Sequence, residues 1–428
     1  MWMSREMKDS GVEWLGQIPQ EWFKVKVKDL VKIVGGNGFP IKLQGKRNGD
    51  YPFYKNSDLN VNGPYINSAN NYLDNQIVEQ KKYSIIPKNS IIMSKIGESM
   101  KKNHRKINIE ACLIDNNIQA LVSKNIIDTN YKYLYYLMTI IDSNWFDNRG
   151  TVPSINNNAF KNQIVFIPDE STQSIIANFL DRKTTEIDTI VDKTKQSIEE
   201  LKAYKQSLIT ETVTKGLNPD VPMKDSGIEW ISKIPEHWEV NLGKRIFNRE
   251  ERPKLDEEGV ITAFRDGEVT LRENRRTEGF THSSKEIGYQ GIRKGDLVIH
   301  GMDAFAGAIG VSDSNGKSSP VYIVLSSSEN INNYYYAYLL KVYAWNGYIE
   351  SMATGIRQRS TDFRYSTFSM TPLVQPTIEE QNKIVEFLNK RNQQIDNLVS
   401  KKEKMIKELE SYKQSLTYEY VTGKKEVE

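Results

Sequence analysis

The chain contains two copies of a frame made of two separate segments. Residues 7–22 read MKDSGVEWLGQIPQEW and residues 223–238 read MKDSGIEWISKIPEHW, with ten of sixteen positions identical. Residues 179–208 read FLDRKTTEIDTIVDKTKQSIEELKAYKQSL and recur at 387–416 as FLNKRNQQIDNLVSKKEKMIKELESYKQSL. The stretches between these segments scarcely match. The pattern indicates a tandem duplication, with two constant parts and two diverged inserts, and predicts a pseudo-twofold internal repeat.

The second repeated segment predicts a long helix in each copy. Residues 172–214 contain no glycine or proline, and their apolar residues recur at heptad spacing, as in coiled coils. One set of residues spaced seven apart begins at Ile187. A second set, with Ile190, Ser197 and Tyr204, follows three residues later. A lone helix cannot bury such a stripe, so we expect the two copies to pair. The pairing residues are then Ile187, Ile198, Leu201, Leu208, Ile395, Ile406, Leu409 and Leu416.

The inserts have a different pattern, in which short β-rich runs alternate with Gly, Asn and Asp turns. Tyr131–Ile141 and Asn332–Trp345 are expected to be buried helices at matching places in the two inserts. The fold class is therefore α/β (mixed α+β): two globular domains separated by two long antiparallel coiled-coil helices. The predicted boundaries are 1–168 for the first domain, 169–216 for the first helix, 217–374 for the second domain and 375–428 for the second helix.

Composition excludes several other classes of protein. Of the 428 residues only Cys112 is a cysteine, so an internal disulfide framework and a multi-thiolate zinc site are excluded. The four histidines show no metal-ligand spacing. No apolar run approaches the roughly 20 residues of a membrane span, and no signal pattern opens the chain. We expect a cytoplasmic protein with no membrane partner.

No catalytic motif is evident. Asn218–Asp220 reads NPD but lacks the second proline and the aromatic residue of an amino-methyltransferase loop, and no G-x-G-x-x-G follows a predicted strand. Gly35–Pro40, GGNGFP, fits a tight turn better than a phosphate cradle, and Ser314–Ser319 fits a hairpin turn. Glu200 and Lys202 lie on the predicted helix, unlike the metal-binding strand of a nuclease. We therefore predict no catalytic, cofactor or metal site in this chain.

Charge distribution favours nucleic acid as the partner of the first insert. Residues 24–161 hold 20 Lys and Arg against 11 Asp and Glu, a difference of +9, whereas residues 239–364 hold 17 of each. DNA reading uses basic and amide side chains on loops. The candidates are Lys101, Lys102, Asn103, His104, Arg105, Arg149, Thr151, Ser154, Asn156, Arg272, Arg275, Arg276, Arg357, Gln358 and Arg359.

Taken together, KDSGVEWLGQIPQEW, KDSGIEWISKIPEHW, IRKGDLVIHG and the paired YKQSL helices resemble the specificity (S) subunit of type I restriction–modification systems. The resemblance implies two target-recognition domains, each reading one half of a split double-stranded DNA sequence. It also implies helices that space the domains and dock two modification (methyltransferase) subunits and, through them, restriction/translocase subunits. S-adenosylmethionine, ATP and Mg²⁺ would then be held by those partners, and the chain itself would be no enzyme.

Two other classes stay open at this point. A stand-alone sequence-specific DNA-binding regulator would lack a methyltransferase that co-purifies with it. An enzyme with unrecognised catalytic residues would methylate or cleave DNA as the pure chain. For the specificity subunit, the diverged inserts predict an asymmetric target, whose half-sites lie about one helical turn (~34 Å) apart or a multiple of it.

Overall fold

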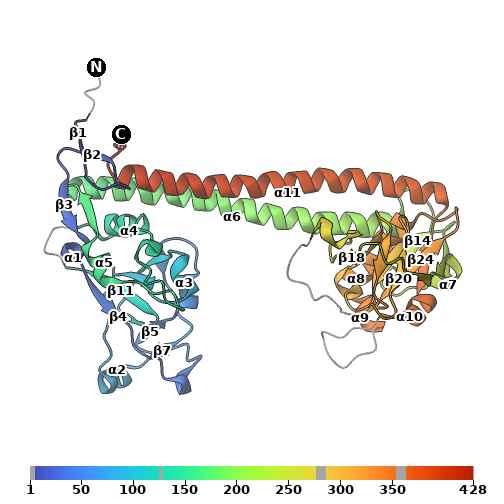
Figure 1. Cartoon of the computed structure of the whole chain (residues 1–428), viewed down its shortest axis with the longest axis horizontal. Helices are drawn as coiled ribbons and strands as arrows, with labels where there is room; N and C mark the ends of the chain where they lie inside the picture. Colours follow the sequence, from blue (N-terminus) through green and yellow to red (C-terminus); the bar gives the residue numbers. More distant parts are fainter. Residues whose placement is uncertain (1–4, 125–128, 276–285, 353–362, 428) are drawn as a thin grey trace. The chain divides into compact units, whose positions relative to one another are not determined.

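The computed structural model describes residues 5–124, 129–275, 286–352 and 363–427. It contains two long helices, α6 (Glu170–Lys215) and α11 (Ile378–Val421), and two sets of short strands and helices (Figure 1). The chain divides into a first unit, residues 1–195 with 402–428, and a second unit, residues 196–401. Helix α6 thus begins in the first unit and ends in the second, and α11 does the reverse.

The first unit is built on a five-stranded sheet in the order β4-β11-β8-β9-β6 and a three-stranded sheet in the order β10-β5-β7. Its elements before α6 are β1 (Met7–Asp9), β2 (Gln17–Pro19), β3 (Phe23–Lys26), α1 (Val27–Leu30), β4 (Val31–Gly35), η1 (Ile41–Leu43), β5 (Tyr51–Tyr54), η2 (Asn56–Leu59), β6 (Tyr65–Ile66), β7 (Tyr72–Leu73), α2 (Asn75–Lys81), β8 (Ile91–Ser94), α3 (Glu98–Lys101), β9 (Arg105–Asn108), β10 (Leu113–Ile114), β11 (Ile118–Ser123), α4 (Tyr131–Thr139), η3 (Ser143–Phe146), α5 (Asn157–Asn162) and β12 (Ile164–Ile167).

The second unit repeats the central part of this plan, with a four-stranded sheet in the order β16-β24-β21-β22. Its elements before α11 are β13 (Met223–Asp225), β14 (Lys233–Pro235), β15 (Glu239–Leu242), α7 (Gly243–Ile246), β16 (Phe247–Arg249), β17 (Arg252–Pro253), β18 (Ile261–Ala263), β19 (Val269–Leu271), η4 (Arg272–Asn274), β20 (Gln290–Ile292), β21 (Leu297–His300), η5 (Ala304–Ala306), β22 (Ile309–Val311), β23 (Gly316–Ser318), β24 (Tyr322–Ser327), α8 (Asn333–Trp345), α9 (Tyr348–Met352), α10 (Tyr365–Met370) and β25 (Pro372–Gln375). The predicted buried helices correspond to α4 and α8.

Two antiparallel strands, which we call the neck, connect each insert to the rest of its unit. In the first unit β3 pairs with β12, and in the second β15 pairs with β25. One backbone hydrogen bond closes each neck at the insert side: Val27 N–H donates to Gln163 O at 3.0 Å, and Gly243 N–H donates to Thr371 O at 2.9 Å. The structure therefore marks residues 27–163 and 243–371 as equivalent inserts.

The repeated N-terminal segments form the same hairpin in both units. In β1–β2, Lys8 faces Ile18, and in β13–β14, Lys224 faces Ile234. A fully buried tryptophan, Trp22 or Trp238, follows each hairpin. The first hairpin packs on the end of α11, where the Tyr418 hydroxyl donates to Trp14 O at 2.7 Å. The second packs on the end of α6, where Ile228 and Trp238 share a core with Val213.

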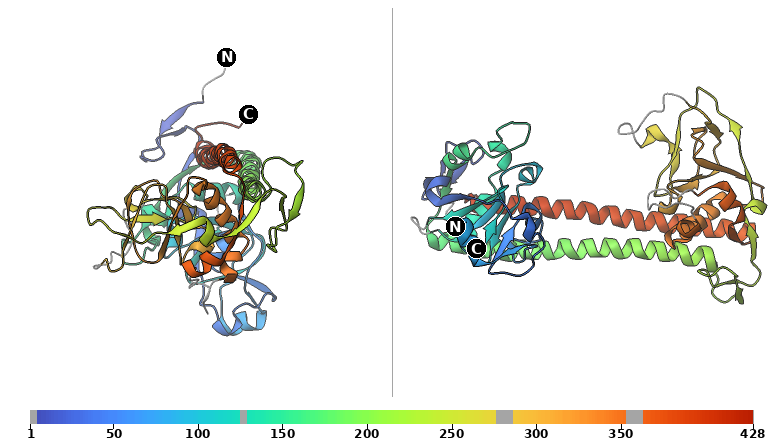
Figure 2. Two further views of the ribbon diagram at one scale, coloured as in Figure 1. Left: turned by 90° about the vertical axis from the view of Figure 1, so that its right-hand side faces the viewer. Right: turned by 90° about the horizontal axis from the view of Figure 1, so that it is seen from below.

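The two long helices pair antiparallel within each unit, as predicted (Figure 2). In the first unit the beginning of α6 packs on the end of α11, and Ile187 and Leu416 share the core. In the second unit the end of α6 packs on the beginning of α11, with Ile209 and Leu388 in the core. Pairs at equivalent places join the helices: Lys413 Nζ lies 2.6 Å from Asp188 Oδ1, and Lys205 Nζ lies 2.7 Å from Asp396 Oδ1.

One detail of the predicted stripe is wrong. Ile190 and Tyr204 are exposed, whereas the buried positions of α6 run Thr184, Ile187, Val191, Thr194 and Ile198. This is an alternating three-and-four spacing, the seam of a coiled coil. Among the expected pairing residues Ile187, Ile198, Ile395 and Leu416 are buried, and Leu201, Leu208, Ile406 and Leu409 are half-buried.

Candidate nucleic-acid interface

The same edge of the main sheet carries loops in both units. In the first unit β11 runs antiparallel to β4 and β8, so the ends of β4 and β8 lie beside the beginning of β11. In the second unit the ends of β16 and β21 lie beside the beginning of β24 for the same reason. We name these two regions the first and second recognition edges.

The first recognition edge brings two of the predicted loops together. The Lys95 carbonyl accepts the Ile155 N–H at 3.0 Å, and Gly97 N–H donates to Pro153 O at 2.8 Å. The segment with Lys101 and Lys102 therefore lies beside the segment that follows Arg149. The Lys95 side chain also reaches the end of β4: its Nζ would lie 3.6 Å from a Cβ added to Gly35.

Exposed polar side chains on this edge remain candidates for contact with DNA. Lys101, Lys102, Arg149 and Thr151 are exposed, and Arg149 has a left-handed backbone (φ 53°). Lys101 pairs with Glu98 at 2.8 Å, but this contact is open to solvent and adds little stability. Such lysines can exchange a surface carboxylate for a phosphate at small cost.

Arg105 lies in the interior, so the structure does not support its assignment as a DNA contact. Only 3% of the residue is exposed. Its guanidinium donates to the Ser143 hydroxyl at 2.7 Å and to Ile141 O at 3.3 Å, which ties β9 to the segment after α4. Burial lowers the pKa of Arg105 to about 10, so it stays charged at neutral pH.

Three other predicted contacts are occupied by structural hydrogen bonds. The Asn103 side chain accepts the Ser143 N–H at 2.9 Å. The Ser154 hydroxyl accepts a hydrogen bond from Asn148 Nδ2 at 3.1 Å. Asn156 caps α5 by accepting the N–H groups of residues 158 and 159 at 3.1 and 3.0 Å. These residues shape the loops, and we leave their side chains out of the proposed DNA-contacting residues.

A cleft of about 780 Å³ lies beneath residues 101–106, within the first unit. Loop 61–63, α4 and parts of both long helices form its other walls. Lys106 closes one side: its Nζ donates to Val61 O at 2.6 Å and also to Gly63 O. Burial lowers the pKa of Lys106 to about 8, and repulsion from Lys413 acts in the same direction. Burial, followed by the nearby cations, also lowers the pKa of His104, which is therefore neutral at pH 7.

In the second unit most described arginines are held by carboxylates, which agrees with the zero net charge of this insert. Arg275 contacts Asp266 and Glu268 at 2.8 Å each and lies 4.2 Å above the Phe264 ring. Arg272 Nε donates to the Thr262 hydroxyl at 3.2 Å. Their assignment as free DNA contacts is not supported. Arg276, Arg357, Gln358 and Arg359 lie outside the described residues, so their assignment stays a prediction.

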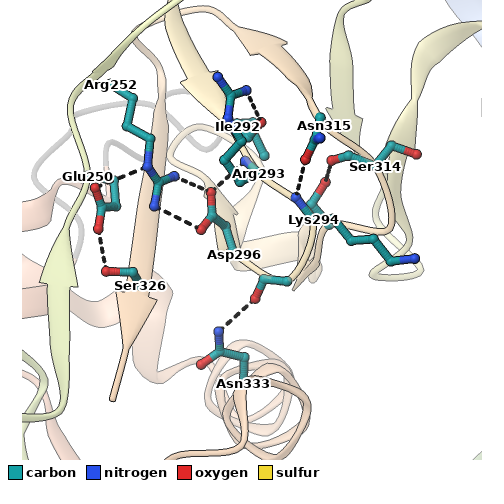
Figure 3. A network of polar contacts seen from close by, with 12 residues as sticks. Glu250, Arg252, Ile292, Arg293, Lys294, Asp296, Ser314, Asn315, Ser326 and Asn333 are labelled. Carbon is teal, nitrogen blue, oxygen red and sulfur yellow. Dashed lines mark hydrogen bonds and ion pairs between the residues drawn. The ribbon is translucent and has the colours of Figure 1, made fainter. Parts of the chain in front are cut away.

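A polar network fixes the turn that leads into β21 (Figure 3). The buried Asp296 accepts two contacts from Arg252, at 2.5 and 3.3 Å, and the Arg293 N–H at 2.7 Å. Asn333, at the start of α8, donates to Gly295 O at 2.7 Å. The conspicuous IRKGD string is thus a structural turn, in which the charges of its arginine and aspartate are used internally.

The second recognition edge carries residues that sequence reasoning missed. A pocket of about 700 Å³ lies where β16 and β21 end and β24 begins, and its walls include Arg249, Met302, Tyr322 and Tyr365. The Arg249 guanidinium lies 5.3 Å from the Tyr365 ring. Only the alignment of the two sheets relates Arg249, which faces Leu325, to Ile33, which faces Leu121 in the first unit. That alignment is not visible where the inserts have diverged in sequence.

No helix in the described part of the chain is long and apolar enough to cross a membrane. Among the same residues no group of three or more His, Cys, Asp or Glu side chains is placed to hold a metal ion.

The repeated frame, diverged inserts and matching edges define a class of protein in which one scaffold presents two different polar surfaces. Residues 19–200 match the family described as type I restriction modification DNA specificity domain. The chain is 22% identical to the MjaVIII specificity subunit of Methanocaldococcus jannaschii, over 95% of this chain and 94% of that protein. It is also 22% identical to the EcoBI specificity subunit of Escherichia coli, over 89% and 81% respectively.

Two solved structures share the fold. One chain, from work on complex assembly and conformational transition of the type I R-M system, has a TM-score of 0.68 at 13% identity and covers 95% of this chain and 99% of its own length. The HsdS subunit from Thermoanaerobacter tengcongensis has a TM-score of 0.51 at 13% identity, with 95% and 98% covered. The chain is therefore related to the specificity subunits of type I restriction enzymes, and the resemblance noted in its sequence is confirmed.

Proposed function

We propose that this chain is the DNA sequence-recognition subunit of a type I restriction–modification complex in the cytoplasm. Each insert reads one half of a bipartite, asymmetric target, and the helix pair sets the spacing and docks two methyltransferase subunits. These partners hold S-adenosylmethionine and recruit the restriction/translocase subunits, which hold ATP and Mg²⁺. The chain contributes recognition and no chemistry of its own.

The observation that carries the proposal is that both inserts are fastened to the helices by the same contacts. Asn130 N–H donates to Gln173 Oε1 at 3.0 Å, and Asn332 N–H donates to Gln381 Oε1 at 2.8 Å. Both glutamines are buried and also donate to a proline carbonyl five residues earlier, at 2.9 Å in each case. A frame that holds two diverged inserts identically is suited to reading two different half-sites.

The helices also carry exposed apolar side chains in each unit. These include Ile190, Met405 and Tyr412 in the first unit and Leu398 and Tyr204 in the second. The two tyrosines occupy the same place in the repeat and are 56% and 57% exposed. Exposed apolar rows beside a seam favour protein contact. Two equivalent rows favour two copies of one partner, as the proposed methyltransferase subunits would be.

The test of the proposal is an exchange of one insert. The neck shows where to cut: residues 27–163 are replaced by the equivalent insert of another specificity subunit, which keeps β3, β12 and their pairing intact. With its methyltransferase partner the hybrid should methylate a target in which one half-site has changed and the other has not. The reciprocal exchange of residues 243–371 is the matched control and should change the other half-site. A hybrid that alters both half-sites, or neither, contradicts the assignment.

A further inference from the structure

The GGNGFP loop of the first insert presents an isolated apolar side chain on a firmly anchored backbone. Ile41 is 87% exposed, the highest value among the large hydrophobic residues that are described. It is the first residue of η1 and directly follows the loop. The sequence favoured a tight turn here over a phosphate cradle. The N–H groups of Gly36 and Asn37 are indeed used internally, on Ile118 O and Ile114 O.

The residues around Ile41 are held in place from several sides. A Cβ on Gly36 would lie 2.0 Å from Asp115 O, so the loop can approach the end of β10 this closely only with glycine at that position. The Phe39 ring packs edge-on against Phe53 at 4.8 Å. On the far side of η1, Gly45 N–H donates to the Asn71 side chain at 2.9 Å. The isoleucine therefore projects from a fixed support.

The segment that carries this projection is rich in cations. Residues 41–55 contain Lys42, Lys46, Arg47 and Lys55 against a single acid, Asp50. Lys55 Nζ lies 4.2 Å from the Phe39 ring and 2.5 Å from Gln44 Oε1, which places a charge against the loop. Lys46 pairs with Asp74, whereas among the described carboxylates none pairs with Lys42 or Arg47. The loop also leaves the sheet at the end of β4, on the first recognition edge.

We propose that Ile41 is an apolar wedge that enters a base step of the DNA bound by the first insert, while Lys42 and Arg47 hold the flanking phosphates. This deepens the proposed function and rests on it. Isoleucine belongs to the side chains that DNA-bending proteins insert between base pairs, partly unstacking them. Contacts between the cations and the backbone phosphates favour binding. The extra contacts that a kinked duplex permits compensate for the free energy lost when the base step is unstacked. A methyltransferase surface would give no reason for Lys42 and Arg47, which pair with none of the described carboxylates.

The experiment uses the full chain and a duplex containing the target found by mapping methylation, with 2-aminopurine placed at successive positions of the first half-site. The wild-type chain should raise the fluorescence at one step, because an unstacked 2-aminopurine is brighter. Ile41→Ala should abolish that rise and weaken binding about tenfold, a loss of ~1.4 kcal/mol. Ile41→Leu should retain both. Ile175→Ala, which truncates a 51% exposed isoleucine of α6 in the same unit, is the matched control and should change neither.

Salt dependence separates the wedge from its cations. Ile41→Ala should leave the dependence of binding on salt unchanged, while Lys42→Ala should reduce its slope by about one, because one phosphate is no longer neutralised, and keep the fluorescence rise. Specific binding without any fluorescence rise refutes the wedge alone. Two other results would also refute it. The first is a loss of binding that is reproduced by replacing thymine with uracil, which would indicate recognition of the thymine methyl group. The second is an Ile41→Ala variant that is defective only in methyltransferase assembly. Absence of specific binding and methylation by the wild-type complex would instead refute the proposed function.

Discussion

At the scale of single residues, the first recognition edge separates charges that face solvent from charges that hold the fold. Lys101 and Lys102 are exposed, whereas Arg105, only a few residues further on, is buried against Ser143. All three are basic and close in sequence, so composition alone cannot tell which of them face solvent and which are buried. The division has a direct consequence for how substitutions should behave.

Replacing Lys101 and Lys102 with alanine should weaken DNA binding and reduce its salt slope by about one for each phosphate that is no longer neutralised, with little effect on stability. Arg105→Ala should instead lower the free energy of unfolding, by roughly 1–3 kcal/mol, because it leaves buried polar groups unpaired. Salt titrations of binding and denaturant titrations of unfolding distinguish the two outcomes. A destabilised lysine double variant, or a stable Arg105→Ala with a reduced salt slope, would reverse the assignment.

Lys106 provides a test of burial through pH. Its pKa is about 8 in the folded chain and near 10.5 when unfolded. Between these values the unfolded state binds more protons, so the free energy of unfolding should rise with pH across this window and be flat below it for this group. Lys106→Met should lack that rise. Comparing the two proteins by denaturant unfolding from pH 7 to 10 isolates the contribution, and parallel curves would contradict it.

At the scale of elements, the repeated segments were enough to predict both long helices and their antiparallel pairing. The buried face was predicted less well, because Ile187, Ile190 and Val191 offer two overlapping heptad rows. The choice between them depends on the partner helix. Likewise, the structural roles of Arg105 and Asn103 depend on Ser143, about 40 residues away, in a part of the insert with no repeat to align.

The seam contains a charge pair whose contribution can be measured. Lys413→Asp should place like charges beside Asp188 and destabilise the chain, and adding Asp188→Lys should restore part of the loss. Both side chains are about one-third exposed (33% and 32%), so a coupling energy of roughly 0.5–1 kcal/mol is expected. Lys202→Asp, on an exposed turn of α6, serves as the control. Additive effects of the two seam substitutions would show that the pair contributes nothing.

At the scale of the whole molecule, the repeat makes each half complementary to a second copy of itself. In a fragment of residues 1–216, the Lys205 of one copy can take the place of Lys413 beside the Asp188 of the other. The fragment should therefore form a twofold dimer. With methyltransferase it should modify a palindrome built from the first half-site. Mass measurement in solution and methylation mapping test this expectation, with Lys205→Asp as the weakened control. A stable monomer or an asymmetric methylated site would contradict it.

The two-stranded neck also bears on how such genes can change. Because an insert begins and ends at hydrogen-bonded neighbours, Val27 with Gln163 and Gly243 with Thr371, its length and sequence can vary while the frame keeps its geometry. Recombination within the repeated stretches on either side would move a whole insert in one event and leave the partner surfaces untouched. Inheritance in such a lineage would then proceed by exchange of intact modules, and a new specificity could arise without a series of partly functional intermediates.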